Sequence, residues 1–373
     1  MNANKVVAIL NCHDDDVFCF RKEIIDDIAD NGYTVLVSCP YGSRIESIKR
    51  KNVVYENISI DRRGTNPFKD LKLLYDYIRL FKKYKPFVVF SFTIKPNIYG
   101  GLASKILGIP YVNNITGLGS GFENGGIIKK VISTMYRIVL NSSYMVFFQN
   151  EVNKERILSA GIMHHDRYQL IPGSGVNLNR FCFCEYPKEE IIRFNYIGRV
   201  MKEKNIDDYL YIAEEIKKKY DNVEFYIIGF IEESELHYHD LLRELEAKGI
   251  VKYCGSQHDI RPFIERSSAI IHPSTYGEGL SNVLLESAAM GRVLLTTTVP
   301  GCNETVEEGL NGFHFEPNNR SMMIDVVEKF ILLSTEKKAE MGKASRCLVE
   351  KKFSREIVVT KYHNLVKDLD TLG

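Results

Sequence analysis

The sequence predicts an α/β protein made of two doubly wound, Rossmann-like domains. Its 373 residues exceed the size of one ordinary domain. Short apolar runs alternate with helical patterns along the chain, which is typical of parallel strands joined by right-handed helical crossovers. The alternation stops after Ile171-Pro172 in a segment rich in Gly, Pro, Phe and Cys, and it restarts near residue 193. We therefore expect a hinge near 172–190, with the two domains facing each other across a cleft.

The first half is expected to form five buried strands with helices between them. Each strand is a short, β-prone apolar run, and each helix shows apolar residues at helical spacing. The expected strands are 6–10, 33–39, 87–92, 111–114 and 144–148. The expected helices lie near 19–31, 68–84, 98–107, 127–141 and 150–159.

The second half repeats this alternation after the hinge. Strands are expected at 193–197, 224–228, 251–253, 269–272 and 293–297. Helices are expected at 205–220 and 234–248, and another is expected to begin near Val283. Because a doubly wound sheet binds its ligand beyond the carboxyl ends of its strands, the functional residues should lie just after these strands.

Composition and charge exclude several classes of protein. A content of 45% hydrophobic and 26% charged residues is typical of a globular chain rather than a disordered one. Residues 1–170 contain 23 Lys and Arg against 16 Asp and Glu, a net +7, and the remaining residues contain 26 against 32, a net −6. The basic half suggests an anionic surface or ligand, and nucleic acid is not an expected partner.

The sequence also bears on the compartment of the protein. No run reaches the roughly 18–20 apolar residues of a membrane-spanning helix, and the apolar run near the start is too short for a signal peptide. The eight cysteines are scattered without a CxxC pair, which favours a reduced, cytoplasmic protein and makes a zinc site improbable.

The segment from Ile271 to Gly291 carries the most chemical information. A strand ends at Pro273, a glycine-containing loop follows, and a helix then begins. The free N–H groups and the positive dipole end of such a helix suit a phosphate or diphosphate. Glu278 and Glu286 have seven residues between them, and both could accept hydrogen bonds from sugar hydroxyls. On spacing alone, a solvated Glu278 and a Glu286 that complements the helix dipole remain the simpler reading.

A second segment, Phe194 to Asn205, supplies positive charge after a strand. Gly198 ends the strand, and Arg199 and Lys204 follow on the turn into the next helix. Two cations at this position could neutralise a leaving diphosphate, Arg through a planar fork and Lys as a point charge. Taken alone, the segment also fits an ordinary solvated basic turn.

Together these segments resemble the donor half of retaining family 4 glycosyltransferases. The motifs occur in the family's order: Tyr-Ile-Gly-Arg-x4-Lys, Phe-Tyr-Ile-Ile-Gly229, His-Pro-Ser-x2-Gly-Glu-Gly-Leu-x5-Glu, and Pro-Gly-x2-Glu-x-Val-x3-Leu-Asn-Gly312. The resemblance covers roughly residues 170–355 and implies the GT-B fold. It implies an acceptor-binding domain at 1–172, a nucleotide-sugar domain at 173–355, and a C-terminal helix at 356–373 that crosses back to the first domain.

The resemblance also implies roles for individual residues. Arg199 and Lys204 would hold the nucleotide diphosphate, Glu286 the ribose hydroxyls, and Glu278 hydroxyls of the donor sugar. The expected donor-binding residues are Gly198, Gly229, Gly279, Leu280, Ser281, Asn282 and Glu286. Such enzymes keep the anomeric configuration, usually without a metal, and preorganised cations stabilise the charge that grows on the leaving phosphate.

The first half resembles the family more loosely. Ser91 to Gly100 and Asn113 to Phe122 look like a subgroup that extends lipid-linked oligosaccharides for bacterial surface polysaccharides, typically with UDP-linked donors. Many family members carry a His in the segment here occupied by Thr116, and others carry one where Ser91 and Thr93 stand, so the resemblance does not extend to a catalytic imidazole. Lys95, Asn97 and Thr116 are the expected sugar-facing residues, and a structural turn around Pro96 is an equally good explanation of each.

His13-Asp14-Asp15-Asp16 follows the first strand and could suggest a metal site. The acidic residues lack a spaced histidine partner, and a diphosphate held by two cations needs no divalent ion. We therefore expect an acidic helix N-terminus with His13 near the acceptor, and no metal. The absence of G-x-G-x-x-G at this position weakens a nicotinamide oxidoreductase reading.

Helix 127–140 has a broad apolar face with Lys129, Lys130 and Arg137 toward the other side. Core packing explains such a stripe more often than membrane contact does. With Arg62, Arg63 and the lysines at 82, 83 and 85 in the same half, docking on anionic lipid is a reasonable hypothesis.

These observations favour a cytoplasmic, peripherally membrane-associated retaining glycosyltransferase without a cofactor. Its donor would be a UDP-linked hexose or N-acetylhexosamine, and its acceptor a polyprenyl-diphosphate-linked saccharide at the inner face of the cytoplasmic membrane. The alternatives are the same chemistry on a soluble acceptor, a UDP-sugar epimerase, and a nucleotide-sugar-binding protein that has lost activity.

Overall fold

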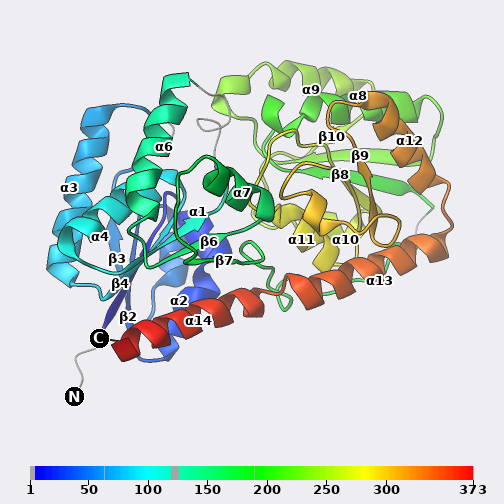
Figure 1. Cartoon of the computed structure of the whole chain (residues 1–373). Coiled ribbons are helices and arrows are strands. Elements are labelled where there is room, and N and C mark those ends of the chain that lie inside the picture. The colour runs from blue at the N-terminus through cyan, green and yellow to red at the C-terminus, as the bar shows by residue number, and fades with distance from the viewer. Residues whose placement is uncertain (1–4, 63, 119–125, 189, 373) are drawn as a thin grey trace. The chain divides into compact units, whose positions relative to one another are not determined.

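The computed structural model describes residues 5–62, 64–118, 126–188 and 190–372. It divides into two compact units, one formed by Met1–Ser174 with Arg355–Gly373 and the other by Gly175–Ser354. Each unit is built on one parallel sheet with helices between its strands (Figure 1). The expectation of two Rossmann-like α/β units is therefore confirmed.

The sheet of the first unit has the order β3-β2-β1-β4-β5-β6-β7, and all its described strand pairs are parallel. Its strands are β1 (Val6–Leu10), β2 (Thr34–Cys39), β3 (Val53–Asn57), β4 (Val88–Phe92), β5 (Tyr111–Ile115), β6 (Met145–Phe148) and β7 (Tyr168–Leu170). Its helices are α1 (Asp14–Phe20), α2 (Lys22–Asp30), α3 (Pro67–Tyr84), α4 (Gly101–Leu107), α6 (Gly126–Leu140), α7 (Glu151–Ser159) and α14 (Arg355–Leu372). The short turns η1 (Ser43–Ile48) and η2 (Pro96–Gly100) complete this unit.

Both faces of this sheet are buried, because alternate residues of β1 enter different cores. Val7 and Ile9 pack with the apolar face of α14, including Tyr362. Ala8 and Leu10 pack on the other side with the buried face of α3. The C-terminal helix α14 therefore covers the sheet of the first unit and lies beside α2 (Figure 1).

The sheet of the second unit has the order β10-β9-β8-β11-β12-β13, again with parallel pairs. Its strands are β8 (Ile192–Ile197), β9 (Val223–Ile228), β10 (Lys252–Tyr253), β11 (Ala269–His272), β12 (Val293–Thr297) and β13 (Gly312–Phe315). Its helices are α8 (Ile206–Lys217), α9 (Tyr238–Ala247), α10 (Arg261–Arg266), α11 (Asn282–Ala289), α12 (Arg320–Ile331) and α13 (Thr335–Lys352). The short turns are η3 (Lys202–Lys204), η4 (Glu233–Glu235) and η5 (Asn303–Thr305).

Two cores also flank the second sheet. Phe194 and Tyr196 of β8 face the core that contains Tyr209 of α8. Ile197 of β8 and Leu284 of α11 belong to the other core, which lies under the loop after β11. The helix that follows this loop is therefore fixed to the sheet by apolar contacts.

Every strand expected from the sequence is present, and three further strands were missed. β3, β7 and β13 are edge or near-edge strands, and their sequences VVYEN, YQL and GFHF are short or interrupted by polar residues and glycine. A strand that is only partly buried needs no long apolar run, so the hydrophobic pattern was too weak to predict it. Within the described part of the chain, no helix is long and apolar enough to cross a membrane.

Candidate active site

In the second sheet, the order in which strands are added reverses between β8 and β11. These two strands are neighbours although β9 and β10 separate them in sequence. In a doubly wound sheet, ligands bind beyond the carboxyl ends of the strands at such a switch point. The segment with Arg199 and Lys204 follows β8, and the segment with Glu278 follows β11. The topology therefore brings together two motifs that lie more than seventy residues apart in the sequence.

The turns after β8 and β9 approach each other closely. Gly198 directly follows β8 and Gly229 directly follows β9, with φ angles of 157° and 149°. A Cβ atom on Gly229 would lie 1.8 Å from the carbonyl oxygen of Gly198. Only glycine fits at position 229, because the atom it would meet belongs to the backbone and cannot move away.

Lys204 and Glu278 form an ion pair at the switch point. Lys204 is the last residue of η3, and Glu278 lies in the loop between β11 and α11. The two side chains are only 12% and 21% exposed. The carboxylate and the ammonium group are therefore held in place before any ligand binds.

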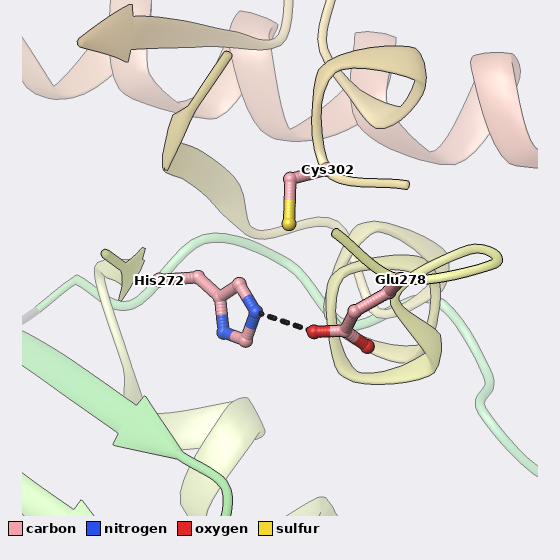
Figure 2. Close-up of side chains that lie close together, drawn as sticks. All are labelled: His272, Glu278 and Cys302. Carbon is pink, nitrogen blue, oxygen red and sulfur yellow. Dashed lines mark hydrogen bonds and ion pairs between the residues drawn. The ribbon is translucent and has the colours of Figure 1, made fainter. Parts of the chain in front are cut away.

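Glu278 has a second partner on β11. Nε2 of His272 lies 3.4 Å from Oε1 of Glu278, the oxygen that Lys204 also contacts (Figure 2). Burial by itself would raise the pKa of the Glu278 carboxyl. The charge of Lys204 and the interaction with His272 outweigh burial and hold that pKa well below its usual value. Glu278 is therefore an anion at neutral pH.

His272 is itself buried at the end of β11. Burial lowers the pKa of the imidazole, despite the nearby Glu278 carboxylate. Nε2 also lies 3.4 Å from Oγ of Ser281, whereas Nδ1 has no hydrogen-bond partner among the described residues. His272 is therefore a neutral ring that positions the loop through its contacts with Glu278 and Ser281. Sequence reasoning read it only as part of a motif and gave it no role.

The loop that carries Glu278 is fixed by the segment after β12. The backbone N–H of Glu278 donates to the carbonyl of Pro300 at 3.0 Å, and that of Ser281 donates to the carbonyl of Gly301 at 2.7 Å. Gly301 has a φ of 86°, and a Cβ atom there would lie 2.9 Å from the backbone of Glu278. This close backbone packing preorganises the loop.

The helix α11 begins directly after this loop, with Ser281 as its N-cap. The Ser281 side chain makes no capping hydrogen bond to the helix and points to His272 instead. The first turn of α11 therefore has backbone N–H groups that neither the helix nor the cap residue satisfies, and these favour an anion. Gly279 and Leu280 are buried, Asn282 is half-buried, and Glu286 lies half-buried further along the helix.

Arg199 does not share the partner of Lys204. Its Nη1 atom donates to Oε1 of Glu232 at 2.6 Å, and the arginine side chain is 31% exposed. Tyr196 fixes the turn by donating to the carbonyl of Arg199 at 2.7 Å. Sequence reasoning missed Glu232. Its position three residues after Gly229, beyond the end of β9, was the available signal.

Among the residues that the structure describes, two clusters offer metal-ligand atoms within 4.8 Å of one another, and one of them is His272, Glu278 and Cys302. Figure 2 shows the three side chains directed toward a common point. Burial raises the pKa of the Cys302 thiol, and Lys204 already supplies positive charge to the Glu278 carboxylate. Both features disfavour a cation there. The other cluster is His13, Asp14 and Asp15.

The acidic run after β1 forms the first turn of α1, as the sequence predicted. His13 is the N-cap, and its Nδ1 atom accepts a hydrogen bond from the backbone N–H of Asp15 at 3.2 Å. Asp14 is buried and accepts from the backbone N–H of Arg44 at 3.0 Å. His13 stays largely exposed at the carboxyl edge of the sheet, and its contact with an acceptor stays a prediction.

The remaining expected residues of the first unit lie after β4 and β5. Lys95 is paired with Asp70 of α3 at 2.6 Å, and both side chains are mostly buried. Thr116 directly follows β5 and is half-buried. Asn97 is fully buried, and its side chain joins β4 to β5: Nδ2 donates to the carbonyl of Asn114 and Oδ1 accepts from Ser91, both at 2.8 Å. Lys95 and Asn97 thus have structural partners, and their contact with sugar stays a prediction.

Thr93, at the carboxyl end of β4, was also missed as a candidate. Its φ of 69° is unusual for a β-branched residue, and its hydroxyl is buried. Part of the expected motif at 113–122 and Arg63 lie outside the described residues, as do the side chains of 127 and 128 in the proposed lipid-facing helix.

Comparison with known proteins gives the chain its family. Residues 7–150 match the model "Glycosyl transferase 4-like", and residues 185–347 match "Glycosyl transferases group 1". Solved structures share the fold over nearly the whole chain. A glycosyltransferase from Rickettsia africae has a TM-score of 0.79 at 17% identity and covers 99% of both chains. Anabaena HepE in complex with UDP and glucose has a TM-score of 0.80 at 16% identity, covering 97% of this chain and 99% of that one.

The two parallel-sheet units and these matches define a glycosyltransferase of the GT-B fold. More particularly, the chain belongs to the glycosyltransferases that join a family 4-like domain to a group 1 domain, and its relatives include named bacterial glycosyltransferases. One is the N,N'-diacetylbacillosaminyl-diphospho-undecaprenol alpha-1,3-N-acetylgalactosaminyltransferase of Campylobacter jejuni, 25% identical over 94% of this chain and 95% of that enzyme. Another is the capsular polysaccharide biosynthesis glycosyltransferase CapM of Staphylococcus aureus, 27% identical over 84% and 90%.

Proposed function

We propose that the protein transfers a hexose or N-acetylhexosamine from a UDP-sugar to a polyprenyl-diphosphate-linked saccharide, with retention of the anomeric configuration. The observation that carries the donor side of this proposal is the Lys204–Glu278 pair beside the amino end of α11. The acceptor class is supported by relatives whose names state a diphospho-undecaprenol acceptor, among them the Escherichia coli UDP-Gal:alpha-D-GlcNAc-diphosphoundecaprenol alpha-1,3-galactosyltransferase, 25% identical over 71% of both chains.

Breaking the bond between the sugar and the nucleotide leaves negative charge on the departing diphosphate and positive charge on the anomeric carbon. Lys204, Arg199 and the first-turn amides of α11 would stabilise the diphosphate, since they already lie at one sheet edge. Glu278, held as an anion, would accept hydrogen bonds from hydroxyls of the donor sugar. Glu286 would do the same for the ribose. No residue in this scheme requires a cofactor or metal.

The acceptor would bind at the carboxyl edge of the first sheet, where His13 and Thr116 follow β1 and β5. A polyprenyl-linked acceptor lies in a membrane, so the enzyme would work as a peripheral protein at the inner face of the cytoplasmic membrane. The sugar identity depends on single hydroxyl contacts, which a panel of UDP-sugar donors distinguishes.

The test incubates the purified chain with UDP-galactose, UDP-glucose and their N-acetylated forms, each with a synthetic polyprenyl-diphosphate saccharide. The expected result is transfer from one of these donors to the lipid-linked saccharide, with a product that NMR shows to keep the anomeric configuration of the donor. Arg199→Met should lower turnover about 10²–10³-fold, because it removes one preorganised cation from the leaving diphosphate.

Arg193→Met is the matched control, since Arg193 lies at the other end of β8 and pairs with Glu224 at 2.8 Å. This variant should keep wild-type turnover. Donor binding without transfer would contradict the enzyme assignment and favour an inactive binder. Transfer to a free sugar, but not to the lipid-linked saccharide, would contradict the acceptor class. Equal turnover of the two arginine variants would contradict the role of Arg199.

A further inference from the structure

The outer face of α3 carries large apolar side chains in contact with solvent. Phe68, Leu71 and Tyr75 are 83%, 64% and 59% exposed. They are spaced three and four residues apart and so form one stripe along the helix. The inward face of α3, formed by residues 73, 77 and 81, is buried in the core. The exposed stripe is therefore a surface feature and takes no part in the packing of this unit.

The stripe continues onto two neighbouring helices. α4 contacts both α3 and α6, and the three lie side by side on one face of the sheet (Figure 1). Ile106 of α4 and Val131 and Ile138 of α6 are also exposed. Together with the stripe of α3, these six make up half of the twelve large apolar residues that are exposed in the described part of the chain. We call these six residues the apolar patch.

Basic residues surround the apolar patch. α3, α4 and α6 together contain nine Lys and Arg and two Asp. On α3, Arg79 and Lys82 extend the line of the exposed stripe, and the guanidinium of Arg79 lies 6.0 Å from the Tyr75 ring. Glu56 and Asp61 pair with two lysines of α3, and the surface stays positive when both are counted. Positive charge around exposed aromatic and aliphatic residues is complementary to an anionic lipid surface.

From this surface we infer that α3, with α4 and α6, docks the protein on a bilayer that contains anionic phospholipid. The apolar patch enters the boundary between headgroups and acyl chains, and the surrounding cations contact the headgroups. The inference deepens the proposed function, because a polyprenyl-linked acceptor would be reached from this surface. The sequence-based hypothesis placed the apolar contact on helix 127–140, with basic residues at 62, 63, 82, 83 and 85 in the same half. The structure adds α3, which carries the more exposed stripe.

The test measures sedimentation of the full chain with vesicles of phosphatidylcholine alone and of equal parts phosphatidylcholine and phosphatidylglycerol. We expect binding to the anionic vesicles, weakened by salt because exposed charges are screened. The triple variant Phe68→Ser/Leu71→Ser/Tyr75→Ser should lower the partition coefficient about ten-fold or more. Arg79→Gln and Lys82→Gln should each lower it about five-fold on anionic vesicles.

Leu332→Ser is the matched control, because Leu332 is 75% exposed but lies in the second unit. This variant should bind vesicles like the wild type. Equal binding of the triple variant and the wild type would overturn the inference, as would equal wild-type binding to the two kinds of vesicle. Binding that requires an added membrane protein would also overturn it and would favour a protein partner.

Activity separates this inference from the proposed function. With a short-chain, water-soluble acceptor analogue, the triple variant should turn over like the wild type, because the patch lies outside the expected catalytic residues. With a long-chain acceptor in vesicles, its turnover should fall with its binding. A wild-type protein that binds vesicles but transfers to neither acceptor would refute the proposed function and leave the docking surface standing.

Discussion

Lys204 and Glu278 form an ion pair on which both stability and the proposed function would depend. Two opposite charges that are mostly shielded from water stabilise each other only while both are present. The pair is held between η3 and the loop after β11, with His272 as a further neighbour of the carboxylate. A bound diphosphate would share Lys204 with Glu278, so ligand binding and folding should depend on the same ammonium group.

The first prediction concerns the free energy of unfolding of Lys204 and Glu278 variants. Lys204→Met and Glu278→Gln should each lose about 3 kcal/mol, because each leaves a partly buried charge without its partner. The double variant should lose clearly less than the sum of the two. Urea unfolding of the four proteins measures this coupling.

Lys248→Met and Glu244→Gln are the matched control, since these residues form an exposed pair at the end of α9 and should couple by less than about 0.5 kcal/mol.

The coupling of the Lys204–Glu278 pair should also depend on pH. The pKa of Glu278 lies below its ordinary value of 4.5, so the unfolded state takes up the proton first on acidification. The coupling between Lys204 and Glu278 should be complete above about pH 4.5 and should decline as the pH falls toward the lowered pKa of Glu278. Additive losses at neutral pH would contradict the pair's role.

At the scale of elements, the second unit depends on how closely its strand-ending turns approach. The turns after β8 and β9 meet at Gly198 and Gly229, so the segment with Arg199 leaves the sheet at a fixed position. On the other side of the switch point, Gly301 lets the segment after β12 support the backbone of Glu278. Close backbone contacts at these glycines therefore fix the segments that carry the charged side chains.

The second prediction compares two glycines with positive φ. Gly229→Ala should cost at least about 3 kcal/mol of unfolding free energy, because its Cβ would overlap the Gly198 carbonyl. Gly249→Ala should cost only about 1 kcal/mol, since Gly249 has a φ of 69° and nothing within 4 Å of its Cβ position. Thermal unfolding with matched calorimetry measures both. Similar losses in the two variants would show that backbone conformation, and not close approach, decides the effect.

At the scale of the whole molecule, the chain has separate cores in its two units. α14, from the end of the sequence, packs into the core of the first unit, where Tyr362 donates to Oδ1 of Asn114. In the second unit, Tyr209 of α8 donates to the carbonyls of Phe194 at 2.9 Å and Tyr226 at 2.8 Å. Both tyrosines are fully buried.

The third prediction follows from these separate cores. Tyr362→Ala should destabilise the first unit by about 3–5 kcal/mol and reduce amide-exchange protection in residues 5–174, with little change in 175–354. Tyr209→Ala should give the reverse pattern. Hydrogen exchange followed by mass spectrometry reports both. Equal loss of protection in both units from either variant would show that they unfold as one.

The sequence by itself determined the fold class, the order of the main strands along the chain and the two segments that meet at the candidate site. Buried parallel strands such as β1 are continuous apolar runs, and the Gly-Arg and Gly-Glu-Gly motifs are local patterns. Edge strands such as β3 are half-exposed and leave no such pattern.

Only the tertiary structure decided which side chains pair. Glu278 with Lys204, Arg199 with Glu232 and Lys95 with Asp70 are contacts between segments far apart in the sequence. The same holds for the exposure of α3, because an amphipathic helix with apolar residues on more than one side does not reveal which side the core will cover. Pairing and burial depend on how strands order themselves in a sheet, and this order is a property of the folded chain that no local pattern contains.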